Sequence, residues 1–270
     1  MRRPALRYHG GKWRLAPWII RHFPRHRIYV EPFGGAASVL MQKPPSPVEV
    51  LNDLNGRIVS AFRVLRDPES AQRLSGLLAL TPYAEAEYRA CKTPAPDPVE
   101  DARRLITLSY QAHGSTGASG GKATGWRRGD RGGRSTSARD WASLPDEVMQ
   151  WCERLRGVFI EQSDALGIIE RYDSPETLFY VDPPYVPETR STERGYAYEL
   201  SLEQHELLSR KLGEVRGLVI VSGYRSTLYD EIYQGWHRMD KRSVADAGKA
   251  TVESIWLSPR IQSTELPLFT

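Results

Sequence analysis

Several common patterns are missing from this chain of 270 residues, and each absence excludes a class of protein. No stretch approaches the roughly 20 consecutive apolar residues that a membrane-spanning helix needs. No apolar segment follows the basic start Met1-Arg2-Arg3-Pro4, so a secretory signal peptide is not expected. The two cysteines, Cys91 and Cys152, are spaced neither for a zinc site nor for a redox pair. A reducing compartment and a protein without a metal are therefore expected.

The positive charge of the chain is concentrated in one segment. The whole sequence has 37 Lys and Arg against 33 Asp and Glu, a net charge of +4. Residues 121–139 alone carry +5, because they contain one acid, Asp130, and six basic residues: Lys122, Arg127, Arg128, Arg131, Arg134 and Arg139. Such a patch indicates a polyanionic partner whose phosphates it neutralises. A solvated basic loop without a ligand is the alternative.

Seven short apolar runs predict the strands of one sheet. They lie at residues 28–30, 48–51, 158–160, 178–181, 218–221, 236–239 and 254–257. Small residues after the first run predict a helix-like stretch at 38–42, and an amphipathic pattern predicts a helix at 54–65. Because helices alternate with the first strands, the strands are expected to pair in parallel. We predict an α/β fold with a mostly parallel seven-stranded sheet and helices on both of its faces.

The pattern changes between residues 68 and 140. Helical patterns cover 69–80, 83–91 and 100–113, and a loop rich in Gly and Arg follows at 114–134, with no β pattern between them. We interpret residues 68–140 as a mostly helical insertion. The remaining segments, 1–67 and 141–270, then form one discontinuous domain.

The motif Asp182-Pro183-Pro184-Tyr185 directly follows the strand predicted at 178–181. Two consecutive prolines can neither continue a ladder nor enter a helix interior, so the chain must leave the sheet in a rigid turn. The turn places a carboxylate, a carbonyl and an aromatic ring at the carboxyl end of a strand, where open α/β sheets bind ligands. These groups suit a planar base with an exocyclic amino group. A plain surface turn is the alternative.

A glycine-containing turn follows the first predicted strand. In Phe33-Gly34-Gly35-Ala36-Ala37 the glycines let the backbone pass close to a ligand. Asp53 closes the second strand about 18 residues later, where an acid in dinucleotide-type folds binds ribose hydroxyls. The turn matches neither the Gly-x-Gly-x-x-Gly fingerprint nor a Walker sequence, which favours a nucleoside without phosphates. A tight turn and a helix-capping Asp53 are the alternative.

Two further elements are candidates for a ligand site. Tyr8-His9-Gly10-Gly11-Lys12 places a glycine pair beside an amine that could reach a carboxylate, although it could also be a basic terminus without a ligand. Asp164 follows the strand at 158–160 and could accept a hydrogen bond from an adenine amino group. Taken alone, a cap on a helix at 165–171 is the simpler interpretation of Asp164.

In this order the motifs resemble the α-group of S-adenosylmethionine-dependent DNA adenine-N6 methyltransferases, the Dam-like family with its many phage members. The resemblance covers most of the chain. The matching segments are Tyr8-x-Gly10-Gly11-Lys12, Glu31-Pro32-Phe33-x-Gly35-Ala36, Asn52-Asp53-Leu54-Asn55, 159–164, Asp182-Pro183-Pro184-Tyr185 and Ser222-Gly223-Tyr224. The chain departs from the family at Gly34-Gly35-Ala36-Ala37, where members often have Gly-Ala-Gly, and at Tyr8, where Dam itself has tryptophan.

The resemblance implies a Rossmann-like class I methyltransferase fold with a target-recognition insertion. It implies methyl transfer from S-adenosylmethionine to N6 of an adenine flipped out of double-stranded DNA, in the cytoplasm of a bacterium or a phage-infected host, without a metal or an obligate protein partner. The expected cofactor contacts are Tyr8, Lys12, Glu31, Pro32, Phe33, Gly35, Asp53, Asp164 and Asp182. The expected adenine contacts are Asp182, Pro183, Pro184 and Tyr185, and the expected DNA contacts are Lys122, Arg127, Arg128, Arg131, Arg134 and Arg190.

The residue types suit this chemistry. The lone pair of an adenine amino nitrogen is conjugated with the ring, and the Asp182 carboxylate and the Pro183 carbonyl can each accept one of its N–H bonds. These acceptors would turn the lone pair toward the methyl group and stabilise the positive charge that develops on nitrogen. Flipping the base costs a few kcal/mol, of which stacking on Tyr185 could offset about 1–3 kcal/mol.

Other functions use related motifs. Cytosine-N4 methyltransferases usually begin the tetrapeptide with Ser, some RNA adenine methyltransferases share the Asp version, and protein-glutamine methyltransferases normally carry Asn. A catalytically silent DNA-binding protein on the same fold is a further alternative, and the glycine pattern disfavours an NAD-type oxidoreductase. Asp182 and the order of the motifs favour adenine in DNA over these alternatives.

Overall fold

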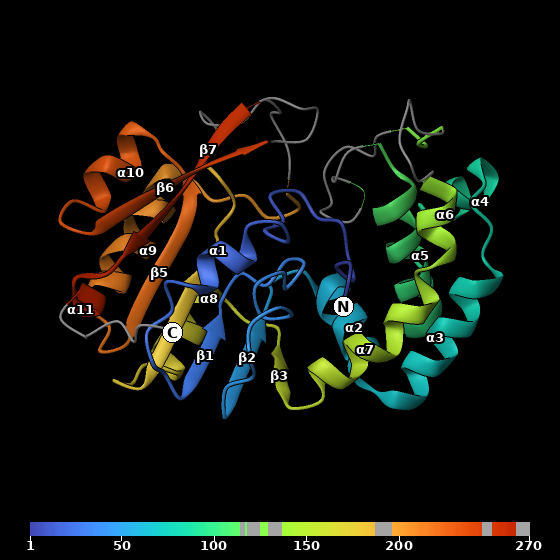
Figure 1. Cartoon of the computed structure of the whole chain (residues 1–270), viewed down its shortest axis with the longest axis horizontal. Helices are drawn as coiled ribbons and strands as arrows, with labels where there is room; N and C mark the ends of the chain where they lie inside the picture. Colours follow the sequence, from blue (N-terminus) through green and yellow to red (C-terminus); the bar gives the residue numbers. More distant parts are fainter. Residues whose placement is uncertain (114–116, 118–124, 129–136, 187–195, 245–249, 263–270) are drawn as a thin grey trace. The chain divides into compact units, whose positions relative to one another are not determined.

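A computed structural model describes residues 1–113, 117, 125–128, 137–186, 196–244 and 250–262 (Figure 1). Contacts between Cα atoms divide the chain into two compact units. Unit 1 comprises Met1–Trp13, Asn55–Gly157 and Arg194–Ala197, and unit 2 comprises Arg14–Leu54, Val158–Glu193 and Tyr198–Thr270. In the described part of the chain, no helix is long and apolar enough to cross a membrane.

Unit 2 contains a seven-stranded sheet in the order β3-β2-β1-β4-β5-β7-β6. The strands are β1 (Ile28–Glu31), β2 (Val48–Asn52), β3 (Val158–Glu161), β4 (Thr177–Val181), β5 (Leu218–Tyr224), β6 (His237–Val244) and β7 (Ala250–Leu257). Strands β1 to β5 pair in parallel, and β7 lies antiparallel between β5 and β6. The predicted mostly parallel sheet of seven strands is confirmed.

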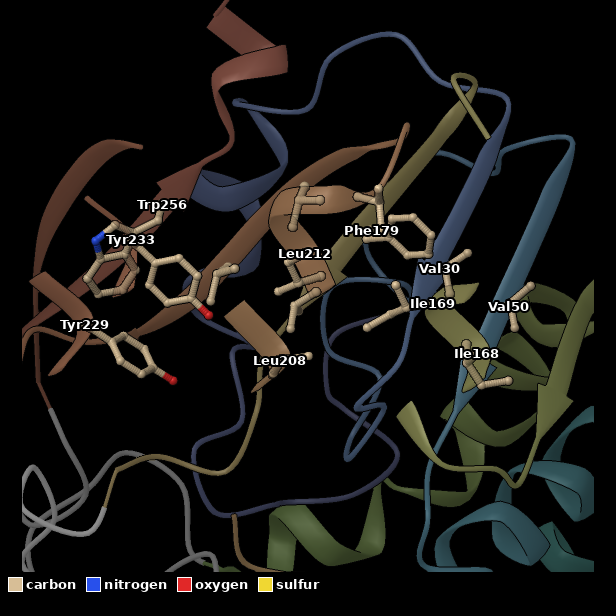
Figure 2. Packing of buried hydrophobic residues seen from close by; sticks show 14 of the residues in the cluster. Val30, Val50, Ile168, Ile169, Phe179, Leu208, Leu212, Tyr229, Tyr233 and Trp256 are labelled. Atoms are coloured by element: carbon tan, nitrogen blue, oxygen red, sulfur yellow. The ribbon is translucent and has the colours of Figure 1, made fainter. Parts of the chain in front are cut away.

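Alternate residues of the central strands form a hydrophobic core on one side of the sheet. Val30, Val50 and Phe179 come from three neighbouring strands and belong to one buried cluster. Figure 2 shows that helices α8 (Ala165–Arg171) and α9 (Leu202–Glu214) bring Ile168, Ile169, Leu208 and Leu212 to this cluster. Tyr229 of helix α10 (Thr227–Ile232), Tyr233 directly after that helix and Trp256 of strand β7 extend the cluster.

The residues between these positions face the other side of the sheet, because side chains alternate along a strand. Tyr29 and Tyr180 are buried there, with ring centroids 5.6 and 6.3 Å from that of Phe23. Phe23 belongs to the segment that follows α1 (Ala16–Ile20). Strand β4 is buried along its whole length, as is typical of a central parallel strand.

The stretch predicted as helix-like at 38–42 is helical only in part: the Met41 and Lys43 N–H groups donate to the carbonyls four residues earlier, those of Ala37 and Val39, both at 2.9 Å. The chain there forms successive turns after Ala37, which adopts a left-handed φ of 51°. The Leu40 N–H, which precedes the first of these helical bonds, donates to the Glu31 carboxylate at 2.7 Å. A tertiary hydrogen bond to the end of β1 therefore anchors the start of these helical turns.

The described helices of unit 1 are α2 (Gly56–Arg66), α3 (Pro68–Leu80), α4 (Glu85–Ala90), α5 (Pro98–Gln111), α6 (Ser137–Ala142) and α7 (Pro145–Leu155). Both α3 and α5 begin at an Asp-Pro pair. Asp67 accepts a hydrogen bond from the Ser70 N–H at 2.8 Å, and Asp97 accepts one from the Glu100 N–H at 3.0 Å. An Asp cap followed by Pro in the first turn is a strong helix start, which explains why these helices could be predicted.

Unit 1 extends beyond the predicted insertion at 68–140. Helix α2 packs with α3, α5 and α7, and Arg57 of α2 donates to both carboxylate oxygens of Asp101 in α5 at 2.9 Å. The N-terminal segment belongs to the same unit, where the Trp151 indole N–H of α7 donates to the Arg3 carbonyl at 3.1 Å. The division into a catalytic domain and a target-recognition insertion stays a prediction.

Candidate active site

The turn after β1 is tied to the end of β2. The Gly34 N–H donates to the Asn52 carbonyl at 2.7 Å, and the Gly35 N–H donates to Asp53 Oδ2 at 2.8 Å. Gly35 has a φ of 48°, which favours glycine. Asp53 does not cap the following helix, because the Asn55 side chain accepts the Arg57 N–H there. The acid that closes β2 thus orders the glycine turn.

Asn52 joins the carboxyl ends of three neighbouring strands. Its side-chain amide donates to the Pro32 carbonyl at 2.9 Å and to the Ser163 carbonyl at 3.0 Å, and its oxygen accepts the Ser163 N–H at 2.9 Å. Asn52 is 1% exposed, so the sheet edge is held together from within. Asn52 belongs to the motif Asn52-Asp53-Leu54-Asn55, but no role was predicted for it. Its position, a polar residue at the end of a buried strand, is the signal that could have indicated its structural role.

Asp164 caps helix α8. Its Oδ1 accepts the Leu166 N–H at 2.9 Å, which confirms the simpler of the two interpretations of this residue. The Asp164 side chain is also exposed, at the carboxyl end of β3 beside β2. Its contact with a cofactor stays a prediction.

Asp182 leaves the end of β4 with its carboxylate held by the neighbouring strand. Ser222 of β5 donates its hydroxyl to Asp182 Oδ1 at 2.7 Å. The Ser222 oxygen also lies 2.8 Å from the Tyr180 hydroxyl oxygen. Asp182 is half-buried, and Pro183 is buried. Like Asn52, Ser222 belongs to a sequence motif, Ser222-Gly223-Tyr224, but no role was predicted for it.

Tyr185 contacts Tyr224, a member of the motif Ser222-Gly223-Tyr224 for which no role was predicted, and Glu253, which belongs to no predicted motif. Its ring centroid lies 4.7 Å from that of Tyr224, and its hydroxyl donates to Glu253 Oε2 of β7 at 3.4 Å. The pKa of Tyr224 is raised to about 12, chiefly by burial and secondly by the negative charge of the nearby Glu253 carboxylate. Tyr185 itself is 3% exposed. The stacking of Tyr185 on a base stays a prediction.

Glu31 is a buried carboxyl at the end of β1. It is 2% exposed, and its Oε1 accepts hydrogen bonds from the Tyr29 hydroxyl and from the Leu40 N–H, both at 2.7 Å. Burial raises the pKa of Glu31 to about 7; the negative charge of Asp182 also raises it, while the two hydrogen bonds lower it. The electrostatic interaction between Glu31 and Asp182 therefore couples the end of β1 to the motif that follows β4.

Replacing Glu31 with Gln is expected to flatten the dependence of stability on pH. The folded-state pKa lies above the ordinary value of 4.5, so the folded protein favours the protonated form, and the free energy of unfolding falls as the pH rises from 4.5 to about 7. Wild-type protein should lose about 2 kcal/mol more between pH 5 and pH 8 than Glu31→Gln, as measured by urea unfolding. Parallel stability curves would contradict this assignment.

Tyr8 and Lys12 belong to unit 1. The Gly11 N–H donates to the Tyr8 carbonyl at 3.0 Å, and Gly10 between them has a φ of 72°. Lys12 is 2% exposed, and its amine donates to the Gly10 carbonyl at 2.9 Å. The expected glycine turn is therefore present, and the contacts of Tyr8 and Lys12 with a cofactor stay predictions.

Among the predicted DNA-binding residues, Lys122, Arg131, Arg134 and Arg190 lie outside the described residues. Arg127 and Arg128 lie beside Trp126, which forms an antiparallel bridge with Ala112 at the end of α5. Trp126 packs against a small core that includes Tyr88, and the Arg127 N–H donates to the Gln111 carbonyl at 2.8 Å. The exposed Arg128 side chain lies 3.2 Å from Glu85. The backbone of Arg127 is thus held by the end of α5, and the side chain of Arg128 contacts α4.

Comparison with known proteins identifies the family. The model of the D12 class N6 adenine-specific DNA methyltransferases matches residues 8–245. The DNA adenine methylase of Salmonella typhi is 27% identical over 250 residues, and the match covers 86% of this chain and 84% of that protein. The DNA adenine methylase of Escherichia coli K12 is 27% identical over 246 residues, with the same coverage.

Among solved structures, the rRNA methyltransferase aviRa from Streptomyces viridochromogenes has a TM-score of 0.37 and 12% identity, covering 91% of this chain and 84% of that chain. The family match spans the glycine turn, Asp53 and the motif at 182–185. The seven-stranded sheet is the Rossmann-like methyltransferase fold that the resemblance implied. The chain therefore belongs to the D12 class N6 adenine-specific DNA methyltransferase family.

Proposed function

We propose that this chain transfers the methyl group of S-adenosylmethionine to N6 of an adenine flipped out of double-stranded DNA, at the carboxyl ends of β1, β2 and β4. The observation that carries the proposal is the adjacency of β1 and β4. These strands pair in parallel with Val30 opposite Phe179, so the glycine turn and Asp182-Pro183-Pro184-Tyr185 leave the sheet at the same edge. β1 lies between β2 and β4, at the point where the strand order reverses, which is where open α/β sheets bind ligands.

Asp182 and Pro183 are the proposed acceptors for the adenine amino group. An amino nitrogen whose lone pair is conjugated with a ring becomes a better nucleophile when both N–H bonds are held out of the ring plane. The same acceptors stabilise the positive charge that develops on nitrogen. Ser222, which donates to Asp182 Oδ1 at 2.7 Å, supports this role by restricting the carboxylate.

The acceptors at the ends of β2 and β3 fit a nucleoside. The Asp53 N–H donates to the Glu161 carbonyl at 3.3 Å, so the two strand ends that carry Asp53 and Asp164 are adjacent. Carboxylates accept from the hydroxyl and amino groups that a nucleoside presents. Asp53 would hold the ribose and Asp164 the adenine. When bound, S-adenosylmethionine supplies an electrophilic methyl group on its sulfonium.

Other contacts are proposed around the same cofactor. Phe33 and Gly35 would shape the pocket at its amino-acid end, and Glu31 and Pro32 would support them from the end of β1. Tyr8 and Lys12 are the remaining proposed contacts of S-adenosylmethionine.

Tyr185 is the proposed stacking partner of the flipped adenine. Stacking a base on an aromatic ring contributes about 1–3 kcal/mol and offsets part of the energy of flipping. Because Tyr185 is 3% exposed, a base can stack on it only after the atoms that cover the ring have moved. Tyr224 would hold the ring during that change.

The basic segment at 121–139 is the proposed contact with the DNA backbone. The family acts on DNA, and DNA binding by Lys and Arg releases counterions from the phosphates. Since the substrate would be cellular DNA, we place the activity in the cytoplasm. Methylation of duplex DNA should be faster than that of single-stranded DNA or RNA of the same sequence. Preferential methylation of RNA would overturn the proposal.

Replacing both Arg127 and Arg128 with Gln is expected to weaken DNA binding and to flatten its dependence on salt. The slope of log affinity against log salt concentration should fall by about 0.9 for each phosphate that the variant no longer neutralises. Fluorescence anisotropy over a range of salt concentrations measures the slope. A charge-matched control replaces Arg63 and Arg156, two exposed residues of the same unit. An unchanged slope would show that Arg127 and Arg128 do not neutralise phosphates and that the DNA-binding surface lies elsewhere.

A further inference from the structure

We propose that Ser222 and Tyr180 are positioning residues, two successive hydrogen-bond donors that orient the Asp182 carboxylate for methyl transfer. The inference rests on the proposed role of Asp182. It assigns a role in the reaction to two side chains that lie behind the acceptor and do not touch the substrate.

The three side chains form one chain across two strands. Tyr180 and Asp182 are two positions apart at the end of β4, and Ser222 lies on the neighbouring strand β5, where Tyr180 pairs with Ile220. The distances are 2.8 Å from the Tyr180 hydroxyl to Ser222 Oγ and 2.7 Å from Ser222 Oγ to Asp182 Oδ1. Tyr180 is 3% exposed and Ser222 is 1% exposed, so bulk water does not compete for these bonds.

The direction of the hydrogen bonds follows from the number of protons. An ionised carboxylate only accepts, and a serine hydroxyl has one proton to donate. Because Ser222 gives that proton to Asp182, Tyr180 must donate to the Ser222 oxygen. The pKa of Tyr180 is raised well above 10, chiefly by burial and secondly by the negative charge of Asp182. The tyrosine therefore keeps its proton.

Neutral donors suit the reaction better than a positive charge would. The terminal torsion of an Asp side chain is broad, so a carboxylate at a strand end is poorly oriented by its own backbone. A hydrogen bond from Ser222 to Oδ1 limits this rotation. A lysine or arginine in the place of Ser222 would also hold the carboxylate, but it would cancel the negative charge that stabilises the developing cation on adenine.

The test compares Ser222→Ala, Tyr180→Phe and the double variant in single-turnover methyl transfer, alongside the affinities for S-adenosylmethionine and DNA. Ser222→Ala should lower the rate constant about 10- to 100-fold, the range expected when a reacting group is misplaced, with both affinities within about threefold of wild type. Tyr180→Phe should lower it about 3- to 10-fold, because it acts through Ser222. The double variant should resemble Ser222→Ala, since residues of one chain are not additive.

Two control variants remove buried hydroxyls elsewhere in the same unit. Ser209 donates to the Ile232 carbonyl at 2.7 Å, and the buried Tyr233 hydroxyl has no hydrogen-bond partner among the described residues. Ser209→Ala and Tyr233→Phe can change the unfolding temperature but should leave the rate constant within about twofold of wild type.

The outcomes separate this inference from the function on which it rests. Wild-type protein that forms no N6-methyladenine would overturn the proposed function and, with it, the positioning role. An active wild type with Ser222→Ala or Tyr180→Phe folded and within twofold of its rate would overturn the positioning role alone. The positioning role alone would also be overturned if weaker cofactor binding fully explained the lower rate constant, or if the effects of the two single substitutions were additive in the double variant. If Ser222→Ala does not fold, Tyr180→Phe decides the question.

Discussion

Replacing Asp182 with Asn or Ala is expected to reduce methyl transfer by about 10³-fold while S-adenosylmethionine still binds, the largest effect of any single change considered. Asparagine keeps the size of the side chain and the acceptor for Ser222, which donates to Oδ1 at 2.7 Å. It replaces the negative charge with a neutral amide that presents donors to the adenine amino group. The positive charge that develops on N6 would then lose its main counter-charge.

A single-turnover assay with labelled cofactor measures this loss, and a cofactor titration shows that the variant still binds. Asp173→Asn is a matched control in the same unit. Asp173 accepts the Gly217 N–H at 2.9 Å, just before β5 begins, at the opposite end of that strand from Ser222. Its replacement should leave the rate within about twofold of wild type while it lowers stability. Retained turnover in Asp182→Asn would exclude Asp182 as the acceptor.

Replacing Gly34 with Ala is expected to weaken S-adenosylmethionine binding by at least about tenfold and to lower the free energy of unfolding by about 1–3 kcal/mol. A Cβ atom on Gly34 would lie 2.6 Å from Leu51 Cδ1 and 2.9 Å from the Asn52 carbonyl oxygen. The second atom is backbone, and it accepts the Gly34 N–H at 2.7 Å, so it cannot move without releasing the turn. The turn would then separate from the end of β2 and from Asp53.

Calorimetric titration of the cofactor and urea unfolding measure the two effects. Gly213→Ala is the control, because Gly213 lies in α9 of the same unit and a Cβ there would meet nothing within 4 Å. That variant should bind the cofactor normally and be equally stable or more stable by about 0.5–1 kcal/mol. Wild-type cofactor affinity in Gly34→Ala would show that the turn after β1 does not form the binding site.

The central strands could be predicted because their sequences are apolar and short. The outer strands were predicted too short, at 236–239 and 254–257, whereas β6 is His237–Val244 and β7 is Ala250–Leu257. The outer parts of this antiparallel pair carry polar residues such as Lys241, Arg242 and Glu253, which pair across strands without an apolar signal. Only the register of the folded sheet reveals them.

The candidate site could be predicted where a local motif carries its chemistry. Asp182, Asp53 and the glycine turn follow strands directly, and the order of motifs along the chain predicted the family. The supporting contacts could not be predicted, because they join residues far apart in the sequence. Ser222 reaches Asp182 across 40 positions, and Glu253 reaches Tyr185 across 68. Parallel pairing of β4 with β5, and antiparallel pairing of β5 with β7, create both contacts.

The proposed methyl transfer is tested most directly by incubating the purified protein with unmethylated duplex DNA and methyl-labelled S-adenosylmethionine, followed by digestion and mass spectrometry of the nucleosides. We expect the label to appear in N6-methyladenine, and Asp182→Asn to reduce it by about 10³-fold. Label in N4-methylcytosine, or no label from protein that binds both DNA and cofactor, would contradict adenine-N6 methylation by this chain.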